Sequence, residues 1–239
     1  MKFPILLPNI FNHPFTYESD FNLKVGDYVI VPFGKSKITG VVWDEFEKNN
    51  NRNFKVRGVL KKLNIMPLKK TTIKFLNWFS EYNIIPKGMA LKLVLLSSSA
   101  IEKFPKDTFK NFESEIKSNS IKLSKEQKES LKKMNILNQK FRVHVLQGTT
   151  GSGKTMVYFE ALKEIINKGF QGLILLPEIG LTGQFEKKFI EFFGFTPAVW
   201  HSGISKKKKE IIWSGISNGD IKVIIGARSS LFLPFKKLG

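Results

Sequence analysis

Hydrophobic and polar positions follow two different patterns along the chain, and the change falls near residue 121. Before it, β-prone runs at residues 25–34, 37–43 and 54–60 are separated by Gly, Pro and a polar loop. This pattern predicts short strands in a small barrel or sandwich. After it, continuous apolar strands alternate with amphipathic segments, which predicts an α/β fold with a parallel sheet covered on both faces.

An apolar helical segment, a second apolar segment and a polar linker follow the first strands. Residues 71–82 carry apolar side chains at helical spacing, namely Ile73, Phe75, Leu76, Trp78, Phe79 and Tyr82. A second apolar segment covers residues 89–96. Aromatic side chains on such a face either pack in a core or stack on nucleic-acid bases, and we expect the core. The Ser-rich and polar residues 97–120 are typical of a linker.

The second pattern predicts a definite order of elements. Ser124 and Gln127 form an S-x-x-Q capping box at the start of a helix. Strands are expected at residues 141–147, 172–176, 196–200 and 221–225. Helices are expected at residues 156–167, 181–193 and 205–217.

A phosphate-binding loop lies between the first of these strands and the first of these helices. The motif is G-x-x-x-x-G-K-[ST], and its members are Gly148, Thr149, Thr150, Gly151, Ser152, Gly153, Lys154 and Thr155. Its glycines let backbone N–H groups curl around a phosphate, and the helix that follows directs its positive end there. Lys154 supplies a charge for the β- and γ-phosphates, and the Thr155 hydroxyl is a ligand for Mg²⁺. The loop therefore predicts binding of ATP with Mg²⁺.

Three further polar segments lie where the other predicted strands end. They cover residues 177–184, 201–203 and 226–235. Open parallel sheets bind ligands at this edge. Small hydroxyl residues, glycines and Arg228 suit contacts to a sugar-phosphate backbone, although they are also ordinary turn residues.

Charge and composition narrow the partners. The chain has 39 Lys and Arg against 20 Asp and Glu, a net charge of +19. This excess favours nucleic acid first and an anionic membrane second, while a general bias toward lysine codons is the simpler alternative. Cysteine is absent, which excludes disulfides and Cys-ligated zinc in this stretch. With neither an apolar run of membrane-spanning length nor a signal peptide, we expect a soluble cytoplasmic protein without membrane contacts.

Four segments together resemble the replication-restart helicases of the PriA family, also called primosomal protein N′. They are residues 148–158 (GTTGSGKTMVY), 176–182 (LPEIGLT), 201–203 (HSG) and 225–232 (IGARSSLF). The resemblance implies a RecA-like first lobe of a superfamily 2 helicase, which moves 3′ to 5′ on DNA with ATP. It implies nucleotide contacts by Lys154 and Thr155, an adenine contact by Gln127, and contacts to single-stranded DNA by Glu178, Thr182, Arg228 and Ser229.

The N-terminal region resembles the 3′-DNA-end-binding domain of the same family. The matching residues include Phe15, Tyr17 and Gly26, the segments 31–34 and 40–42, and Tyr82, Pro86 and Gly88. The resemblance implies a pocket for the 3′-terminal nucleotide at a stalled fork, formed by Phe15, Gly34 and Lys55. Thr16 stands where the family usually has an acidic residue. The implied partners are forked or single-stranded DNA, primosome proteins and the single-stranded DNA-binding protein.

These patterns divide the chain into a β-rich DNA-binding domain (residues 1–96), a linker (97–120) and helicase lobe 1 (121–239). The linker is too short for the winged-helix domain that the family has there. In the family, an acidic Walker B box, a second lobe and zinc-binding cysteines follow at this point, so zinc is expected only outside this stretch. The rival interpretations are another superfamily 2 translocase, a P-loop kinase, and a fork-binding module that binds ATP without turnover.

Overall fold

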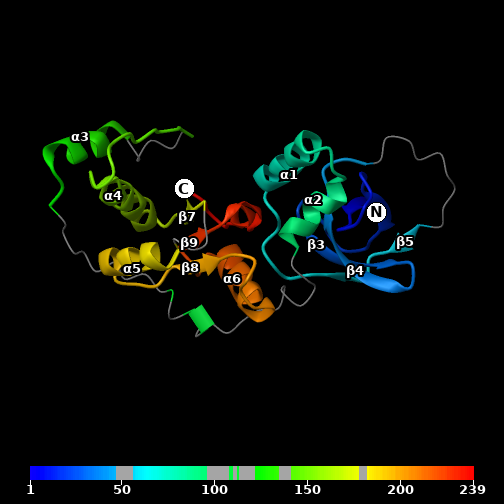
Figure 1. Ribbon diagram of the computed structural model, residues 1–239. Helices are drawn as coiled ribbons and strands as arrows, with labels where there is room; N and C mark the ends of the chain where they lie inside the picture. Colours follow the sequence, from blue (N-terminus) through cyan, green and yellow to red (C-terminus); the bar gives the residue numbers. More distant parts are fainter. Residues whose placement is uncertain (47–55, 96–107, 110–111, 113–121, 135–140, 178–181) are drawn as a thin grey trace. The chain divides into compact units, whose positions relative to one another are not determined.

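The computed structural model describes residues 1–46, 56–95, 108–109, 112, 122–134, 141–177 and 182–239 (Figure 1). The expected linker at 97–120 lies almost wholly outside them. Two compact units are present. The first contains Met1–Phe104, Ser205–Ser217 and Leu231–Pro234, and the second contains Pro105–Ile204, Asn218–Ser230 and Phe235–Gly239. No helix in the described part of the chain has the length and apolar character needed to cross a bilayer.

The first unit contains a single six-stranded sheet. Its strands are β1 (Lys2–Leu6), β2 (Phe15–Glu18), β3 (Tyr28–Phe33), β4 (Ser36–Val42), β5 (Arg57–Gly58) and β6 (Lys61–Lys62), in the order β5-β2-β1-β4-β3-β6. The hairpin predicted between residues 25 and 43 is confirmed as β3 and β4. Of the third predicted strand, at 54–60, the structure describes residues 56–60; within these only β5 forms, and β6 follows it. Strand β1 was not predicted, because Pro4 interrupts its apolar run while pairing with Thr16 of β2.

One face of this sheet closes on itself to form a core. Ile5, Tyr17, Val29, Val31 and Val42 come from four strands and pack in one buried cluster. The sheet therefore curls around these side chains, in place of packing against a second sheet. Gly40 of β4 makes the close approach possible, since a Cβ there would lie 2.7 Å from side-chain atoms of Ile5 and Leu7.

Helices α1 (Lys70–Tyr82) and α2 (Lys87–Val94) belong to the same unit. Helix α1 confirms the predicted helix, and most of the second apolar segment forms α2. The expectation that the aromatic face of α1 lies in the core is only partly right. Ile73 and Leu76 are buried, but Trp78 and Tyr82 are 54% and 73% exposed. The apolar residues of α1 span more of its circumference than the helix buries, so Trp78 and Tyr82 stack on each other at its surface, with ring centroids 5.2 Å apart.

Helix α6 (Lys206–Asn218) confirms the predicted helix at 205–217. Most of it belongs to the first unit, where the Trp213 Nε1–H donates a hydrogen bond to the Val94 carbonyl at 2.8 Å. The Trp213 ring meets Tyr28 edge to face, with centroids 6.0 Å apart. The lysines at the start of α6 are exposed at positions 206–208, as expected for a solvated run of charge.

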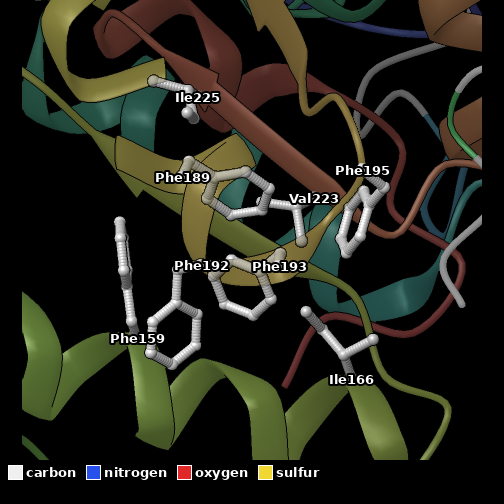
Figure 2. Close-up of a cluster of buried hydrophobic side chains, with 8 residues drawn as sticks. All are labelled: Phe159, Ile166, Phe189, Phe192, Phe193, Phe195, Val223 and Ile225. Atoms are coloured by element: carbon white, nitrogen blue, oxygen red, sulfur yellow. The ribbon is translucent and has the colours of Figure 1, made fainter. Parts of the chain in front are cut away.

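The second unit contains a parallel sheet of β7 (Gly172–Leu175), β8 (Ala198–Trp200) and β9 (Val223–Gly226), in the order β7-β9-β8. Helices α3 (Lys125–Met134), α4 (Lys154–Asn167) and α5 (Thr182–Phe193) belong to the same unit. Figure 2 shows the buried cluster in which α4, α5 and β9 meet. Its members are Phe159, Ile166, Phe189, Phe192, Phe193, Phe195, Val223 and Ile225.

The prediction of a strand at residues 141–147 is wrong. This segment forms no strand, and Phe141, Val143 and Val145 are 92%, 77% and 89% exposed. Its alternating pattern is typical of a strand with one wet face, whereas the strands that pair here are continuous apolar runs such as β9. Strand β9 is paired on both sides, with β7 and with β8, and this segment does not pair with the outer edge of either neighbour.

Candidate nucleotide and DNA sites

The phosphate-binding loop at residues 148–155 leads directly into α4. Gly151 and Gly153 have φ angles of 83° and 78°, which side chains other than glycine rarely adopt. Gly153 is the N-cap of α4. A Cβ at Gly153 would also lie 2.3 Å from Nε2 of Gln127. The backbone angle therefore requires glycine at this position, and a side chain there would also displace the end of Gln127.

Lys154 folds back over the loop. Its Nζ donates hydrogen bonds to the carbonyls of Gly148 at 2.6 Å and Thr149 at 2.7 Å. The Ser152 hydroxyl donates to the same Thr149 carbonyl at 2.8 Å. The ammonium charge thus lies against the backbone of the loop, at the positive N-terminal end of α4. Phosphate oxygens are stronger acceptors than these carbonyls and fit a site that already concentrates positive charge.

Gln127 joins α3 to the loop. Its Oε1 accepts a hydrogen bond from the Ser124 N–H at 2.8 Å, and its own N–H donates to the Ser124 hydroxyl at 3.3 Å. These two bonds confirm the predicted capping box. Its Nε2 donates to the Ser152 carbonyl at 3.2 Å. The structure therefore brings Gln127 to the P-loop, while its contact with adenine stays a prediction.

Glycines and hydroxyls of this loop fit a nucleotide carrying Mg²⁺. A Cβ at Gly151 would meet nothing within 4 Å, so the backbone there is open to a phosphate. Thr155 lies in the first turn of α4, next to Lys154. Lys154 would hold the phosphates, and the Thr155 hydroxyl would hold the metal ion. The bound ion would neutralise phosphate charge and polarise the bond to the γ-phosphorus.

The three strands of the second unit end level with one another. Leu175 of β7 and Trp200 of β8 both pair with Gly226 of β9. The Leu176 N–H donates to the Gly226 carbonyl, and the Ala227 N–H donates to the Trp200 carbonyl, each at 3.1 Å. A Cβ at Gly226 would lie 2.7 Å from the Trp200 oxygen. Glycine is therefore needed for the strands to end together.

The structure describes some of the predicted DNA-contact residues and not others. Arg228 and Ser229 follow β9 after one residue, Ala227; they begin the short 3₁₀ helix η4 (Arg228–Phe232) and are exposed. The turn after β8 lies at the same edge, where the Gly203 N–H donates to Nδ1 of His201 at 3.1 Å. Helix α5 begins at Thr182. Glu178 and the Thr182 side chain lie outside the described residues.

In the first unit, three rings gather beside Phe15. Phe11, His13 and Phe33 have ring centroids 5.2, 5.0 and 5.4 Å from the Phe15 centroid. We call Phe11, His13, Phe15 and Phe33 the aromatic cluster. Phe11, His13 and Phe33 were not predicted as site residues. The two-residue period of β3 places Phe33 on the same face as Val29 and Val31, but nothing in the sequence brings it to Phe15.

Gly34 lies beside this cluster, in the tight turn between β3 and β4. Its φ is 58°, and a Cβ there would meet nothing within 4 Å. The Arg57 Nη1 donates to the Gly34 carbonyl at 3.0 Å, which adds a cation that sequence reasoning missed. Successive residues of a strand face opposite sides of the sheet, so Thr16 lies on the face opposite Phe15. Lys55 lies outside the described residues.

Tyr17 anchors the strand that carries Phe15. It is buried, and its hydroxyl donates to the Pro32 carbonyl at 3.0 Å. Burial raises the pKa of Tyr17, an effect that the positive charge of Arg57 partly offsets. Tyr17 therefore stays neutral at physiological pH and keeps β2 fixed against the end of β3.

Comparison with known protein families matches both parts of the chain. Residues 4–96 match the family described as the 3′ DNA-binding domain (3′BD) of PriA. Residues 120–238 match the family described as the res subunit of type III restriction enzymes, which is a helicase-like domain. The α/β fold with a parallel sheet agrees with this second match.

Several curated relatives are similar over much or all of the chain. The replication restart protein PriA of Rickettsia conorii is 38% identical over 239 residues, which cover 98% of this chain and 36% of that protein. PriA of Haemophilus influenzae is 25% identical over 308 residues, covering 98% of this chain and 42% of that protein. PriA of Bacillus subtilis is 41% identical over 98 residues, covering 41% of this chain and 12% of that protein.

The chain thus spans about a third of the length of the Rickettsia relative that it matches end to end. Its two matched regions follow one another in the order 3′ DNA-binding domain, then helicase-like domain. The chain belongs to the family of the replication restart protein PriA, and it corresponds to the N-terminal part of that protein.

Proposed function

We propose that this chain is the front part of an ATP-dependent helicase that moves 3′ to 5′ on DNA, recognises stalled replication forks and starts primosome assembly. One observation carries this proposal. A complete P-loop, with Gln127 bonded to it, stands in the same chain as a region that matches the PriA 3′ DNA-binding domain. The partners that the resemblance adds are primosome proteins and the single-stranded DNA-binding protein, and zinc belongs to a part of the protein outside this chain.

The proposed division is a DNA-binding domain at residues 1–96, a linker at 97–120 and helicase lobe 1 at 121–239. The alignment with the Haemophilus relative supports a short linker. It needs 308 positions for 98% of this chain, which requires insertions in that relative. The alignment with the Rickettsia relative needs only 239 positions. We propose that a winged-helix domain in the Haemophilus relative accounts for these insertions.

ATP is the proposed nucleotide, and Mg²⁺ is its metal ion. In this proposal Lys154 leaves the carbonyls of Gly148 and Thr149 and binds the β- and γ-phosphates. The Thr155 hydroxyl ligates Mg²⁺. The backbone between Gly148 and Gly153 contributes N–H donors around the phosphates.

Single-stranded DNA is the proposed ligand of the edge where β7, β8 and β9 end. Arg228 and Ser229 would contact the sugar-phosphate backbone, and the resemblance adds Glu178 and Thr182. Such contacts hold a strand without reading its bases. This suits a motor that must move along any sequence.

The aromatic cluster is the proposed site for the 3′-terminal nucleotide. Phe15 would stack on the terminal base, a contact that tolerates any base. Gly34 exposes its backbone beside the ring, and the resemblance adds Lys55 as a contact to DNA. Thr16 replaces the acidic residue usual in the family, and its place on the opposite face of β2 keeps it away from a base stacked on Phe15.

We further propose that residues 1–239 alone bind nucleotide and DNA but turn over little ATP. A motor of this type needs a carboxylate to orient the attacking water and an arginine from a second lobe. The resemblance places the acidic box and the second lobe after residue 239, so neither is expected within residues 1–239. Residues 1–239 by themselves would then act as a fork-binding module that binds ATP without turnover.

Steady-state phosphate release with single-stranded DNA tests this point. We expect turnover far below that of ordinary helicases, for which about 1 per second is a modest rate. Turnover near that rate would show that the chain contains a complete motor. A phosphorylated acceptor in place of free phosphate would favour the P-loop kinase.

A further inference from the structure

The hydroxyl of Tyr158 is bonded to the residue that would ligate Mg²⁺. It donates a hydrogen bond to Oγ1 of Thr155 at 3.2 Å. The two residues are three positions apart in α4, a spacing that brings side chains together on one face of a helix. The function proposed above gives Tyr158 no role, so this bond needs an explanation of its own.

Two aromatic contacts hold the Tyr158 ring. It meets Phe159 edge to face, with centroids 5.4 Å apart and an angle of 90°. It lies nearly parallel to Phe185 of α5, at 6.2 Å and 14°. Phe159 is itself fully buried among the phenylalanines of α5 (Figure 2). The tyrosine hydroxyl therefore extends from a ring fixed on two sides.

The chemistry of a threonine hydroxyl allows this bond and a metal ion together. A hydroxyl oxygen carries two lone pairs and one hydrogen. One lone pair accepts the bond from Tyr158, which leaves the other for a cation and the hydrogen for a phosphate oxygen. A threonine hydroxyl rotates between staggered positions, and a ligand held in one position loses less freedom when the ion binds.

We propose that Tyr158 is a positioning residue that orients the Thr155 hydroxyl toward the Mg²⁺ of a bound nucleotide. The inference rests on the proposed binding of Mg–nucleotide by the P-loop. It assigns the effect to the hydroxyl of Tyr158. The ring packs against Phe159 and Phe185 with or without that group.

Tyr158→Phe removes the hydroxyl and keeps the ring, so it separates positioning from packing. The measurement is titration of residues 1–239 with a fluorescent ATP analogue, in excess Mg²⁺ and again in excess EDTA. We expect the affinity in Mg²⁺ to fall about three- to tenfold, as for the loss of one neutral hydrogen bond. The affinity in EDTA should not change. Tyr82→Phe is the matched control, because it removes an exposed tyrosine hydroxyl from α1.

A second pair of variants tests whether the effect passes through Thr155. Thr155→Ala alone should lose most of the gain in affinity from Mg²⁺. Adding Tyr158→Phe to Thr155→Ala should then cause no further loss, because the group that Tyr158 orients is gone.

The possible results distinguish this inference from the proposal beneath it. An unchanged Mg²⁺-dependence in Tyr158→Phe would overturn the inference. So would an equal loss of affinity in Mg²⁺ and in EDTA, which would indicate a purely structural role. A parent chain that binds no nucleotide in Mg²⁺ would overturn the proposed function itself.

Discussion

The P-loop takes its polar groups from eight consecutive residues, whereas the aromatic cluster takes four rings from two strands and the segment before one of them. The P-loop is exposed at residues 148–152 and half-buried at residues 153–155, and its shape comes from glycines and backbone carbonyls. The aromatic cluster exists only because β2 and β3 belong to a curled sheet with a packed core. Binding and stability are therefore separable in the P-loop and coupled in the aromatic cluster.

Lys154→Ala should produce the largest effect. It removes the charge proposed to bind the phosphates, and hydrogen bonds to charged groups contribute about 1.5–3 kcal/mol each. We expect nucleotide affinity to fall about 10- to 150-fold in a fluorescent-nucleotide titration. Thermal unfolding should be almost unchanged, because Lys154 bonds only to carbonyls of its own loop.

Lys168→Ala is the matched control for this prediction. It removes an exposed lysine at the other end of α4 and should leave nucleotide affinity as it was. If Lys154→Ala and the parent chain bind nucleotide with equal affinity, the P-loop is not the nucleotide site.

Phe15→Ala should abolish the preference for a free 3′ end. Stacking of a base on an aromatic ring contributes about 1–3 kcal/mol, so the ratio between ends should fall by about tenfold. The measurement is a salt titration of DNA affinity, made once on duplexes with a 3′-hydroxyl end and once on duplexes with a 3′-phosphate end. The electrostatic, salt-dependent part of binding should remain.

Phe21→Ala serves as its control, since Phe21 is a partly exposed phenylalanine outside the aromatic cluster. If the parent chain binds both ends equally at every salt concentration, there is no end-binding pocket. Thr16, in place of the usual acidic residue, would then be the first substitution to reverse.

Gly40→Ala tests the coupling between the core and the aromatic cluster. The added methyl group would lie 2.7 Å from side chains of Ile5 and Leu7, and overpacking of this kind costs about 1–3 kcal/mol. We expect a lower free energy of unfolding in a denaturant titration, together with a weaker preference for 3′ ends. Nucleotide affinity should stay the same.

Gly183→Ala is the matched substitution in the second unit, and it should have the opposite effect on stability. Gly183 lies in α5, and a Cβ there meets nothing within 4 Å. Helix propensity predicts a gain of up to about 1 kcal/mol. A Gly40→Ala variant as stable as its parent would show that the sheet curls less tightly than described.

Arg57→Ala should have the smallest effect. Arg57 bonds to the Gly34 carbonyl on the exposed side of the turn, and exposed cations contribute little on their own. We expect DNA affinity to fall about two- to fivefold for every end structure. The salt slope should fall by about one unit if the guanidinium also meets a phosphate.

Arg142→Ala removes the same side chain from an exposed position in the second unit and is the matched control. An effect confined to 3′-ended DNA would place Arg57 in the pocket itself. Lys55→Ala is expected from the resemblance to weaken both parts of DNA binding.

The same contrast decides what the sequence alone could predict. The P-loop, the capping box and the three strands that pair were all readable, because each depends on residues close together in the chain. The rings around Phe15 were not, since Phe33 reaches Phe15 only through the pairing of four strands. Residues 141–147, where the predicted strand does not form, have a local pattern as regular as that of β3. Whether such a segment forms a strand depends on pairing with another strand, which the local pattern does not show. Trp78 and Tyr82 have helical spacing, but spacing alone does not say how much of a helix is covered.

The bonds of Gln127 fix the direction in which its amide could meet a base. Its amide oxygen caps α3 and its amide nitrogen binds the P-loop. The oxygen keeps a second lone pair and the nitrogen keeps a second hydrogen, so an adenine could bond to Gln127 without breaking either contact. Recognition of the base would then use a side chain whose orientation is set before the nucleotide binds, which lowers the entropy lost on binding.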